Sequence, residues 1–522
     1  MVTNSKIFNA RLLTLWMIIF IGINLACKRP WLPEEESTFM VPPQGEEVLI
    51  NTPTPFIMLP PTRAPGAPIL TPTPDNPHQT PKLRVESEKY VVQPGNTLGQ
   101  IAELYSISVE QIVKANRLNN ANVLDVGQTL EIPVATPEES GPSFKLIPNS
   151  ELVYGPYAAF FNLTDFIKNQ AGYLANYHEK IDDNKKLSGA EIIQLVSQNY
   201  SVNPRLLLAL LEYQPQWVTK KNPEKSAQVY PIGWRDPQRE GLYRQLAWAA
   251  NQLNQGYYLW RVNGVVTWVL RDGRVVPIDA TINAGTAGVQ NFFAQLNGYQ
   301  EWEKIVSQDG FISVYQRLFG YPFDLAFEPI LPPGLSQPVL QLPFEGGVSW
   351  AYTGGPHAGW DSGSAWAALD FAPDTEALGC VPSEEWIVAI GAGLVIRSGA
   401  GIVIQDLDDP NGFPSDGLEQ TGWMILYMHV ANQDRIAAGT YLNPGDRIGH
   451  PSCEGGISSG THLHLARRYN GEWIPADQDL PFVMDGWVSV GSGQEYEGYL
   501  ELGNKKIKAD ADNTAQNNTL KR

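Results

Sequence analysis

Basic residues are in short supply in this chain of 522 residues, which has 37 Lys and Arg against 55 Asp and Glu. The resulting formal charge of −18 argues against nucleic acid or an anionic bilayer as the main partner, because both repel an acidic surface. Apolar residues are not scarce: they make up 43% of the chain and include 15 Trp, enough for packed cores. The length exceeds one ordinary core and predicts about two to four domains.

Cysteine is also scarce, since only Cys27, Cys380 and Cys453 occur. Cys27 follows a hydrophobic N-terminal run, so Cys380 and Cys453 remain as a pair in the C-terminal region. In an exported protein such a pair can close a disulfide, whereas a cytosolic enzyme keeps the two thiols reduced. We expect a disulfide between Cys380 and Cys453. The alternative is two buried free thiols that act as small apolar residues.

The N-terminal hydrophobic run is too short for an ordinary membrane-spanning helix. The run LLTLWMIIFIGINLA has 15 residues, whereas a span needs roughly 20. Two basic residues precede it, and a basic start before a short apolar segment is typical of a signal peptide. The run leads into Leu25-Ala26-Cys27, which resembles the lipobox of bacterial lipoproteins, in which the cysteine is acylated and becomes the new N-terminus. Asn24 stands where that motif usually has Leu, and ordinary cleavage or an uncleaved anchor is the alternative.

A segment rich in Pro and Thr follows the hydrophobic run. It contains NTPTPF, LPPTRAPGAP and TPTPDNPHQTP. Proline fixes φ and removes a hydrogen-bond donor, so this stretch cannot build a sheet ladder or a long helix. We expect an extended, semi-rigid spacer.

A compact segment comes next, KYVVQPGNTLGQIAELYSISVEQIVKANRLNNANVLDVGQTLEIPV. Its pattern predicts a strand, two helices and a closing strand, with Ser108 as the N-cap of the second helix. The order β-α-α-β and the segments PGNTL and VGQTLEIP resemble a LysM module. The resemblance implies binding of N-acetylglucosamine chains, as in peptidoglycan. The alternative is a spacer domain that has lost binding.

The middle region, 145–335, is expected to be mostly helical. The segment SGAEIIQLVSQNYSVNPRLLLALLEYQPQW predicts two amphipathic helices: Ser188 caps the first, with Glu191 at capping-box spacing, and Pro204 starts the second. VNPRLLLALLE resembles the helix of lysozyme-like transglycosylases that ends in a catalytic Glu, here Glu212. Such an acid needs a semi-apolar cleft that raises its pKa. The interpretations left open are an active glycosidase, an inactive lysozyme-like wall-binding domain and an unrelated helical spacer.

Histidine is rare, with seven in the chain, yet four of the last five fall in recognisable places. The segment THLHLA alternates and is flanked by glycine-containing turns, which predicts a strand. Residues two apart on a strand point to the same face, so we expect His462 and His464 side by side. ILYMHV predicts another strand, with Tyr427 and His429 on one face. Three protein ligands and one open position suit a hydrolytic zinc ion, and spare imidazoles can move protons beside it.

Together with GGPHAGWDSGSAWAALDFAP, GAGLVIRSG, LNPGDRIGHPS and SSGTHLH, these residues resemble the lysostaphin-like and beta-lytic zinc metallopeptidases, also called LytM-type. The resemblance runs from Gln341 to near Trp487. It implies an antiparallel β-rich peptidase that binds zinc and cuts the peptide part of peptidoglycan. By position in the family motifs, it implies that the zinc ligands are His357, Asp370 and His464, and that the catalytic pair is His429 and His462.

Two aspartates compete for the ligand position after His357. Most of the family has three residues between this His and the Asp, and Asp361 stands at that distance. The beta-lytic branch has a longer gap, with its Asp in a segment like ALDFAP. We choose Asp370 because it begins DFAP and because WDSGSAWAAL matches the long-gap form.

The sequence therefore predicts an α+β multidomain wall hydrolase, a zinc metalloendopeptidase held on glycan by its LysM module. Its partners would be peptidoglycan stem peptide and, through a lipid on Cys27, the outer face of a membrane, but not nucleic acid. The rival is a non-catalytic wall-binding adaptor that regulates another hydrolase. The charged and polar segment after Tyr499 is expected to be disordered. The predicted segments are a lipoprotein-type signal peptide (1–27), the spacer (28–86), the LysM module (87–135), the helical domain (145–335), the peptidase (338–490) and the tail (491–522).

Overall fold

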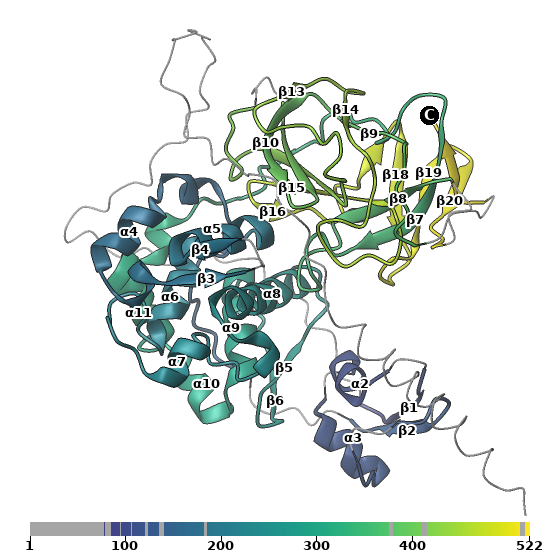
Figure 1. The fold of residues 1–522 in the computed structure, drawn as a ribbon. Coiled ribbons are helices and arrows are strands. Elements are labelled where there is room, and N and C mark those ends of the chain that lie inside the picture. The colour runs from purple at the N-terminus through teal and green to yellow at the C-terminus, as the bar shows by residue number, and fades with distance from the viewer. Residues whose placement is uncertain are drawn as a thin grey trace, which may run out of the picture.

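The computed structural model describes residues 78, 85–93, 96–105, 107–120, 124–134, 140–181, 185–374, 379–408, 415–511 and 517–522. The predicted signal segment with Cys27, and almost all of the predicted spacer, lie outside these residues. Within the described ranges, no helix combines the length and the apolar character that a membrane crossing requires. The predicted α+β class is confirmed: helices predominate in the middle of the chain and antiparallel strands in its C-terminal part, as Figure 1 shows.

The first described module has the predicted β-α-α-β order. Its elements are β1 (Glu88–Val91), α2 (Leu98–Leu104), α3 (Val109–Asn116) and β2 (Thr129–Ile132), with β1 antiparallel to β2. Ser108 caps α3 as expected, in a capping box with Gln111. A small apolar core that includes Ile101, Ile112 and Leu130 holds the helices on the two-stranded sheet.

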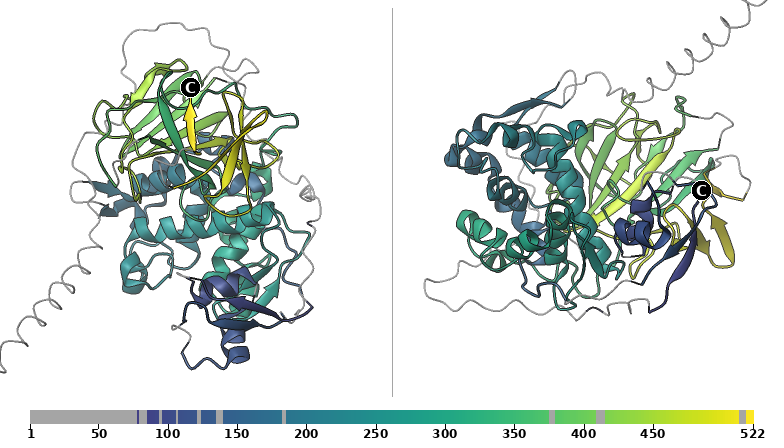
Figure 2. Two further views of the ribbon diagram at one scale, coloured as in Figure 1. Left: turned by 90° about the vertical axis from the view of Figure 1, so that its right-hand side faces the viewer. Right: turned by 90° about the horizontal axis from the view of Figure 1, so that it is seen from below.

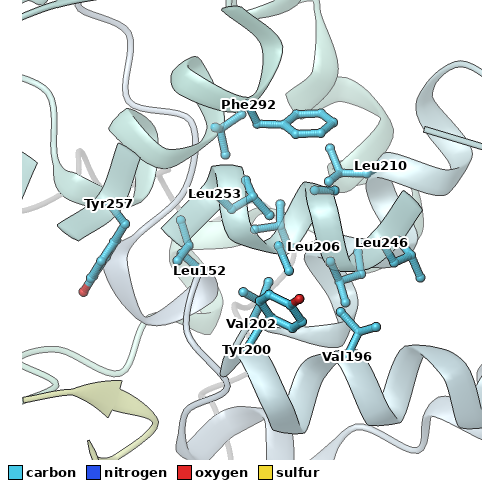
Figure 3. Packing of buried hydrophobic residues seen from close by; sticks show 14 of the residues in the cluster. Leu152, Val196, Tyr200, Val202, Leu206, Leu210, Leu246, Leu253, Tyr257 and Phe292 are labelled. Carbon is cyan, nitrogen blue, oxygen red and sulfur yellow. The ribbon is translucent and has the colours of Figure 1, made fainter. Parts of the chain in front are cut away.

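The helical domain follows, and Figure 3 shows part of its core. Ser188 caps α5 in a capping box with Glu191, and Pro204 is the first residue of α6, both as predicted. Two small hairpins accompany the helices: β3 (His178–Lys180) with β4 (Lys186–Ser188), and β5 (Thr267–Val269) with β6 (Val275–Pro277). The helices are α4 (Leu163–Gln170), α5 (Gly189–Tyr200), α6 (Pro204–Tyr213), α7 (Lys225–Val229), α8 (Leu242–Arg261), α9 (Ala284–Leu296), α10 (Tyr299–Ile305) and α11 (Phe311–Phe319), with five short 3-10 turns between or beside them: Asn149–Glu151, Pro156–Phe160, Tyr173–Asn176, Pro237–Arg239 and Pro322–Leu325.

The β-rich domain is built on an antiparallel sheet with the strand order β13-β10-β11-β12-β15-β8-β7-β21, and β16 pairs with β15. A two-stranded ladder of β9 and β14 lies beside it. The strands of both are β7 (Ser349–His357), β8 (Ala368–Pro373), β9 (Ile387–Val388), β10 (Gly393–Gly399), β11 (Ile402–Leu407), β12 (Trp423–Met428), β13 (Tyr441–Leu442), β14 (Arg447–Gly449), β15 (Leu463–Tyr469), β16 (Glu472–Trp473) and β21 (Thr519–Lys521).

The prediction that the segment after Tyr499 is disordered is wrong for its described residues, 500–511 and 517–522. A second antiparallel sheet contains β17 (Val483–Met484), β18 (Trp487–Gly491), β19 (Gly498–Leu502) and β20 (Lys505–Lys508). After it, β21 pairs with β7 of the main sheet. The cause is that apolar residues alternate with polar ones along these strands. Leu500 and Leu520 point inward and are 0% and 1% exposed, while their charged neighbours face solvent.

The two faces of the main sheet are buried against different partners. On β15, Leu463 and Leu465 pack within the β-rich domain, whereas Ala466 belongs to a cluster that it shares with the helical domain. Residues two apart on a strand share a face, so His464 lies on the side towards the helices. Figures 1 and 2 show the teal helical domain lying against the green β-rich domain in every view. The helical domain thus covers part of the sheet face that carries the predicted site.

Candidate metal centre

Three predicted ligand atoms converge on one point. His357 Nε2 lies 2.9 Å from His464 Nδ1, and Asp370 Oδ1 lies 3.2 Å from each of them. The three side chains come from β7, β8 and β15, and all are buried. The convergence brings together residues that are 107 positions apart in the chain.

Sheet register accounts for this convergence. His464 on β15 is the direct cross-strand partner of Asp370 on β8, and such pairs bring side chains within contact distance. On the other side of β8, Gly354 of β7 faces Asp370, and the register then shifts before His357. A bulge of this kind re-aims the residues that follow it. A β-carbon at Gly354 would lie 2.6 Å from Asp370 Oδ2, so glycine is needed to admit the carboxylate.

Hydrogen bonds to the backbone set the tautomer of each ligand imidazole. His357 Nδ1 lies 2.8 Å from the carbonyl oxygen of Gly355, and His464 Nε2 lies 3.1 Å from that of Gly359. We assign the ring proton to these nitrogens, because a carbonyl oxygen only accepts. The nitrogens that face Asp370 then carry lone pairs. All three converging atoms are therefore acceptors, which is the arrangement a cation requires.

The geometry fits a tetrahedral metal ion. Bonds of about 2.0–2.1 Å at tetrahedral angles separate ligand atoms by about 3.3 Å, close to the observed 2.9 and 3.2 Å. Asp370 Oδ1 is buried and finds no hydrogen-bond partner among the described residues. A buried carboxylate oxygen without a partner is costly, and a cation at the centre of the triangle would remove that cost.

The electrostatics of the cluster agree with a cation site. Burial alone would raise the pKa of Asp370, but the His357 and His462 imidazoles outweigh burial and hold that pKa well below its usual range. Burial opposes protonation of His357, yet the Asp370 carboxylate more than offsets it and raises the pKa of His357. Burial lowers the pKa of His464. The carboxylate therefore stays ionised and attracts positive charge.

The two predicted catalytic histidines lie beside this triangle. His462 Nε2 is 3.8 Å from Asp370 Oδ1, and the His429 and His462 ring centroids are 4.4 Å apart. The Nδ1 atoms lie 2.8 Å from backbone carbonyls, of Glu454 for His429 and of Gly460 for His462. Each ring thus keeps its Nε2 as an acceptor. Burial, with His462 and His464 nearby, lowers the pKa of His429 to about 3.

One detail of the strand prediction is wrong. β12 ends at Met428, and His429 has a φ of 66°. This left-handed backbone breaks the alternation, so Tyr427 and His429 do not share a face. Tyr427 is buried in the core of the β-rich domain, where its hydroxyl donates to Gln405 Oε1.

A residue that the sequence did not indicate also contacts the site. The ring of Tyr496 stacks on His357, with centroids 4.2 Å apart and an interplanar angle of 20°. Tyr496 belongs to the loop between β18 and β19, and its φ is 65°. Burial and the nearby Asp370 carboxylate raise its pKa to about 12. No local pattern marks Tyr496, because its contact with His357 joins distant segments of the chain.

Cys380 and Cys453 form a disulfide in the structure, with an S–S distance of 2.06 Å. The residues on either side of Cys380 support the approach to His462: Thr461 N donates to the Gly379 carbonyl oxygen at 3.0 Å. Thr461 Oγ1 donates to the Val381 carbonyl oxygen at 2.6 Å. The disulfide therefore holds a segment that borders the catalytic side of the cluster.

The structure places Asp361 and Glu212 away from the cluster. Asp361 Oδ2 accepts a hydrogen bond from the Tyr200 hydroxyl, 3.1 Å away, in the helical domain. Glu212 is buried, but it accepts from Thr219 and forms an ion pair with Arg317 at 2.8 Å. Polar and charged partners surround this carboxylate, so Glu212 lacks the semi-apolar cleft that a glycosidase acid needs.

Comparison with known proteins agrees with these features. Residues 90–133 match the family model of the LysM domain, and residues 145–331 match that of the LasA N-terminal domain. Protease LasA of Pseudomonas aeruginosa is 27% identical over 362 residues, covering 64% of this chain and 76% of that protein. The chain is homologous to Protease LasA. The resemblance to LytM-type metallopeptidases with a LysM module is thereby confirmed, and the helical domain resembles the LasA N-terminal domain.

Solved structures similar to this LasA homologue include the M23 metalloprotease pseudoalterin, which is 23% identical, with a TM-score of 0.27, and covers 33% of this chain and 96% of its own. The catalytic domain of the antimicrobial peptidase lysostaphin from Staphylococcus simulans is 21% identical, with a TM-score of 0.17, and covers 25% of this chain and 89% of its own.

Proposed function

We propose that this LasA homologue is a zinc-dependent metalloendopeptidase that hydrolyses peptide bonds of bacterial peptidoglycan. The observation that carries the proposal is the convergence of His357 Nε2, Asp370 Oδ1 and His464 Nδ1 as three acceptors, 2.9–3.2 Å apart. Two imidazoles and one carboxylate form a donor set that zinc hydrolases use, with one position left for water. His429 and His462 lie beside that position with acceptor nitrogens free of backbone partners among the described residues.

Zinc, when bound, supplies Lewis-acid chemistry to a water and to the scissile carbonyl. The chain's own residues handle the protons. His462 Nε2 lies nearest the triangle and can take the proton of the attacking water, then return one to the leaving amine. His429 is neutral at physiological pH, since its pKa is lowered to about 3. It can therefore accept a hydrogen bond at Nε2 without prior deprotonation.

The LysM module supports peptidoglycan as the substrate. A module that binds N-acetylglucosamine chains would keep the peptidase close to the stem peptides of the same polymer. Tethering of this kind raises the local substrate concentration without any new contact at the active site. We also propose export, with acylation of Cys27 at the membrane outer face. Replacement of Cys27 by Ser should then release the protein from membranes.

The test uses the full chain and purified peptidoglycan, with mass spectrometry of the released muropeptides. We expect new free amines and shorter stem peptides, loss of both with a chelator, and recovery with added zinc. His464→Ala should abolish release, whereas His178→Ala, a change of an exposed histidine in the helical domain, should not. Release that persists in chelator would contradict the proposal. Stoichiometric zinc without any release of amines would favour the adaptor.

A further inference from the structure

The loop between the ligands His357 and Asp370 is held by the helical domain. Within this loop, Gly359 N donates to the Ala365 carbonyl oxygen at 3.0 Å, and Trp360 N donates to Ser364 Oγ at 2.8 Å. Residues 359–365 therefore form a compact turn that projects from the sheet. We call these residues the ligand loop.

Two side chains of the helical domain bind the tip of the ligand loop. At the end of α5, the Tyr200 hydroxyl donates to Asp361 Oδ2 at 3.1 Å. On α8, Asn251 Oδ1 accepts from Gly363 N at 2.7 Å and Asn251 Nδ2 donates to Ser362 Oγ at 3.1 Å. A β-carbon at Gly363 would lie 2.1 Å from the Asn251 carbonyl oxygen, so the loop backbone is pressed directly against α8.

The base of the ligand loop touches a metal ligand. The Gly359 carbonyl oxygen accepts from His464 Nε2 at 3.1 Å and fixes the tautomer and orientation of that ring. Gly359 also packs on the Trp473 ring, which a β-carbon would approach to 2.7 Å. Trp473 is in turn tied to the helical domain, because its backbone N–H donates to the Tyr258 hydroxyl at 2.9 Å.

We propose that Tyr200 and Asn251 are positioning residues of the metal centre, through which the docked helical domain sets the affinity for the ion. This inference rests on the proposed zinc function. The path is short: Asn251 and Tyr200 hold the loop tip, the loop holds the Gly359 carbonyl, and that carbonyl orients His464. Outer partners of this kind set ligand orientation, and their loss typically costs about 10–100-fold in metal affinity.

The same contacts explain what Asp361 does. It stands where most LytM-type sequences carry a zinc ligand, but its carboxylate accepts from Tyr200 and from Ser362 N. Its φ of 54° turns the chain away from the sheet. In this chain the short-gap aspartate therefore bridges the two domains, and the longer gap to Asp370 gives the loop the length to reach α8.

The test measures the zinc dissociation constant of the full chain by competition with a chromophoric chelator. Asn251→Ala and Tyr200→Phe should each weaken zinc binding, by about 10-fold or more, and the double variant by more than either. Asn251→Asp keeps the acceptor for Gly363 N and should restore most of the affinity. Asn222→Ala, an exposed asparagine of the helical domain, should match the wild type.

Unfolding of the metal-free proteins distinguishes a positioning role from a general loss of stability. If Tyr200 only positions the loop, the unfolding midpoint of metal-free Tyr200→Phe should be close to that of the wild type. Equal zinc affinity in the wild type and the double variant would overturn the positioning proposal alone. A loss as large in Asn251→Asp as in Asn251→Ala would overturn it too. A wild-type chain that binds no zinc would overturn this proposal and the proposed function together.

Discussion

His464 on β15 faces Asp370 on β8 as a direct cross-strand pair, with Nδ1 and Oδ1 3.2 Å apart. The backbone ladder of the sheet therefore assembles two of the three acceptors before any ion binds. The sheet register, rather than the ion, thus sets the positions of these two ligands.

Substitution of a ligand histidine should remove bound zinc, whereas substitution of a catalytic histidine should not. We expect His464→Ala to lose zinc and activity together, because it removes one of three converging acceptors. His462→Ala should keep zinc but lower the release of amines by about 10²–10⁴-fold, the usual contribution of a proton-transfer group. Metal analysis and muropeptide release on the same samples check both. If His462→Ala loses its zinc, the assigned roles are wrong.

Gly354→Ala should damage the centre without touching a ligand. The new β-carbon would lie 2.6 Å from Asp370 Oδ2, so the carboxylate or the strand must shift. We expect zinc binding to fall sharply, as measured by chelator competition. Gly346→Ala is the matched control, because a β-carbon at that position would meet no atom of the described residues within 4 Å. Normal zinc affinity in Gly354→Ala would show that Asp370 is not held as described.

Acid stability of the metal-free chain should depend on His429. Its pKa is lowered to about 3 in the folded state, against about 6.5 for an exposed histidine. Between these pH values the unfolded chain binds the additional proton, so the free energy of unfolding falls as the pH drops from about 6.5 towards about 3. Above about 6.5 this group has no effect. His429→Gln should flatten the fall in urea midpoint over that window, and identical profiles would contradict the burial of a neutral ring.

Reduction of the Cys380–Cys453 disulfide should lower stability and loosen the approach to His462. The crosslink spans 73 positions, and closing a loop of that length is worth about 4 kcal/mol in the chain-entropy model. We expect a paired Cys→Ser variant to unfold at lower denaturant and to show faster hydrogen exchange at Thr461. Unchanged exchange there would mean that the disulfide supports the domain but not the site.

Much of the site could be predicted because its signals are local. The alternation in THLHLA sets His462 and His464 near each other, whereas the choice of Asp370 depends on the resemblance of ALDFAP to the beta-lytic motif. Capping at Ser188 and the helix start at Pro204 are local signals too. The alternation, the cap and the helix start each depend on a few neighbouring residues and elementary backbone preferences, which is why these expectations agree with the structure.

The remainder depends on contacts between distant segments. Tyr496 reaches His357 only because the second sheet brings the β18–β19 loop over β7. Asp361 matched a ligand spacing, yet Tyr200 of another domain takes its carboxylate. The tail looked disordered because its composition is polar, and composition does not show that Leu520 finds a place beside Trp350. Periodicity within one segment carries no information on these partners.

β21 pairs with β7 along Thr519–Lys521 and covers the outer side of the strand that ends in His357. Without these residues, β7 would present a row of open backbone donors and acceptors, a template onto which a strand of another molecule can add. Shortened chains should therefore self-associate through β7. Removal of β21 by proteolysis should therefore cause aggregation on storage before any loss of zinc.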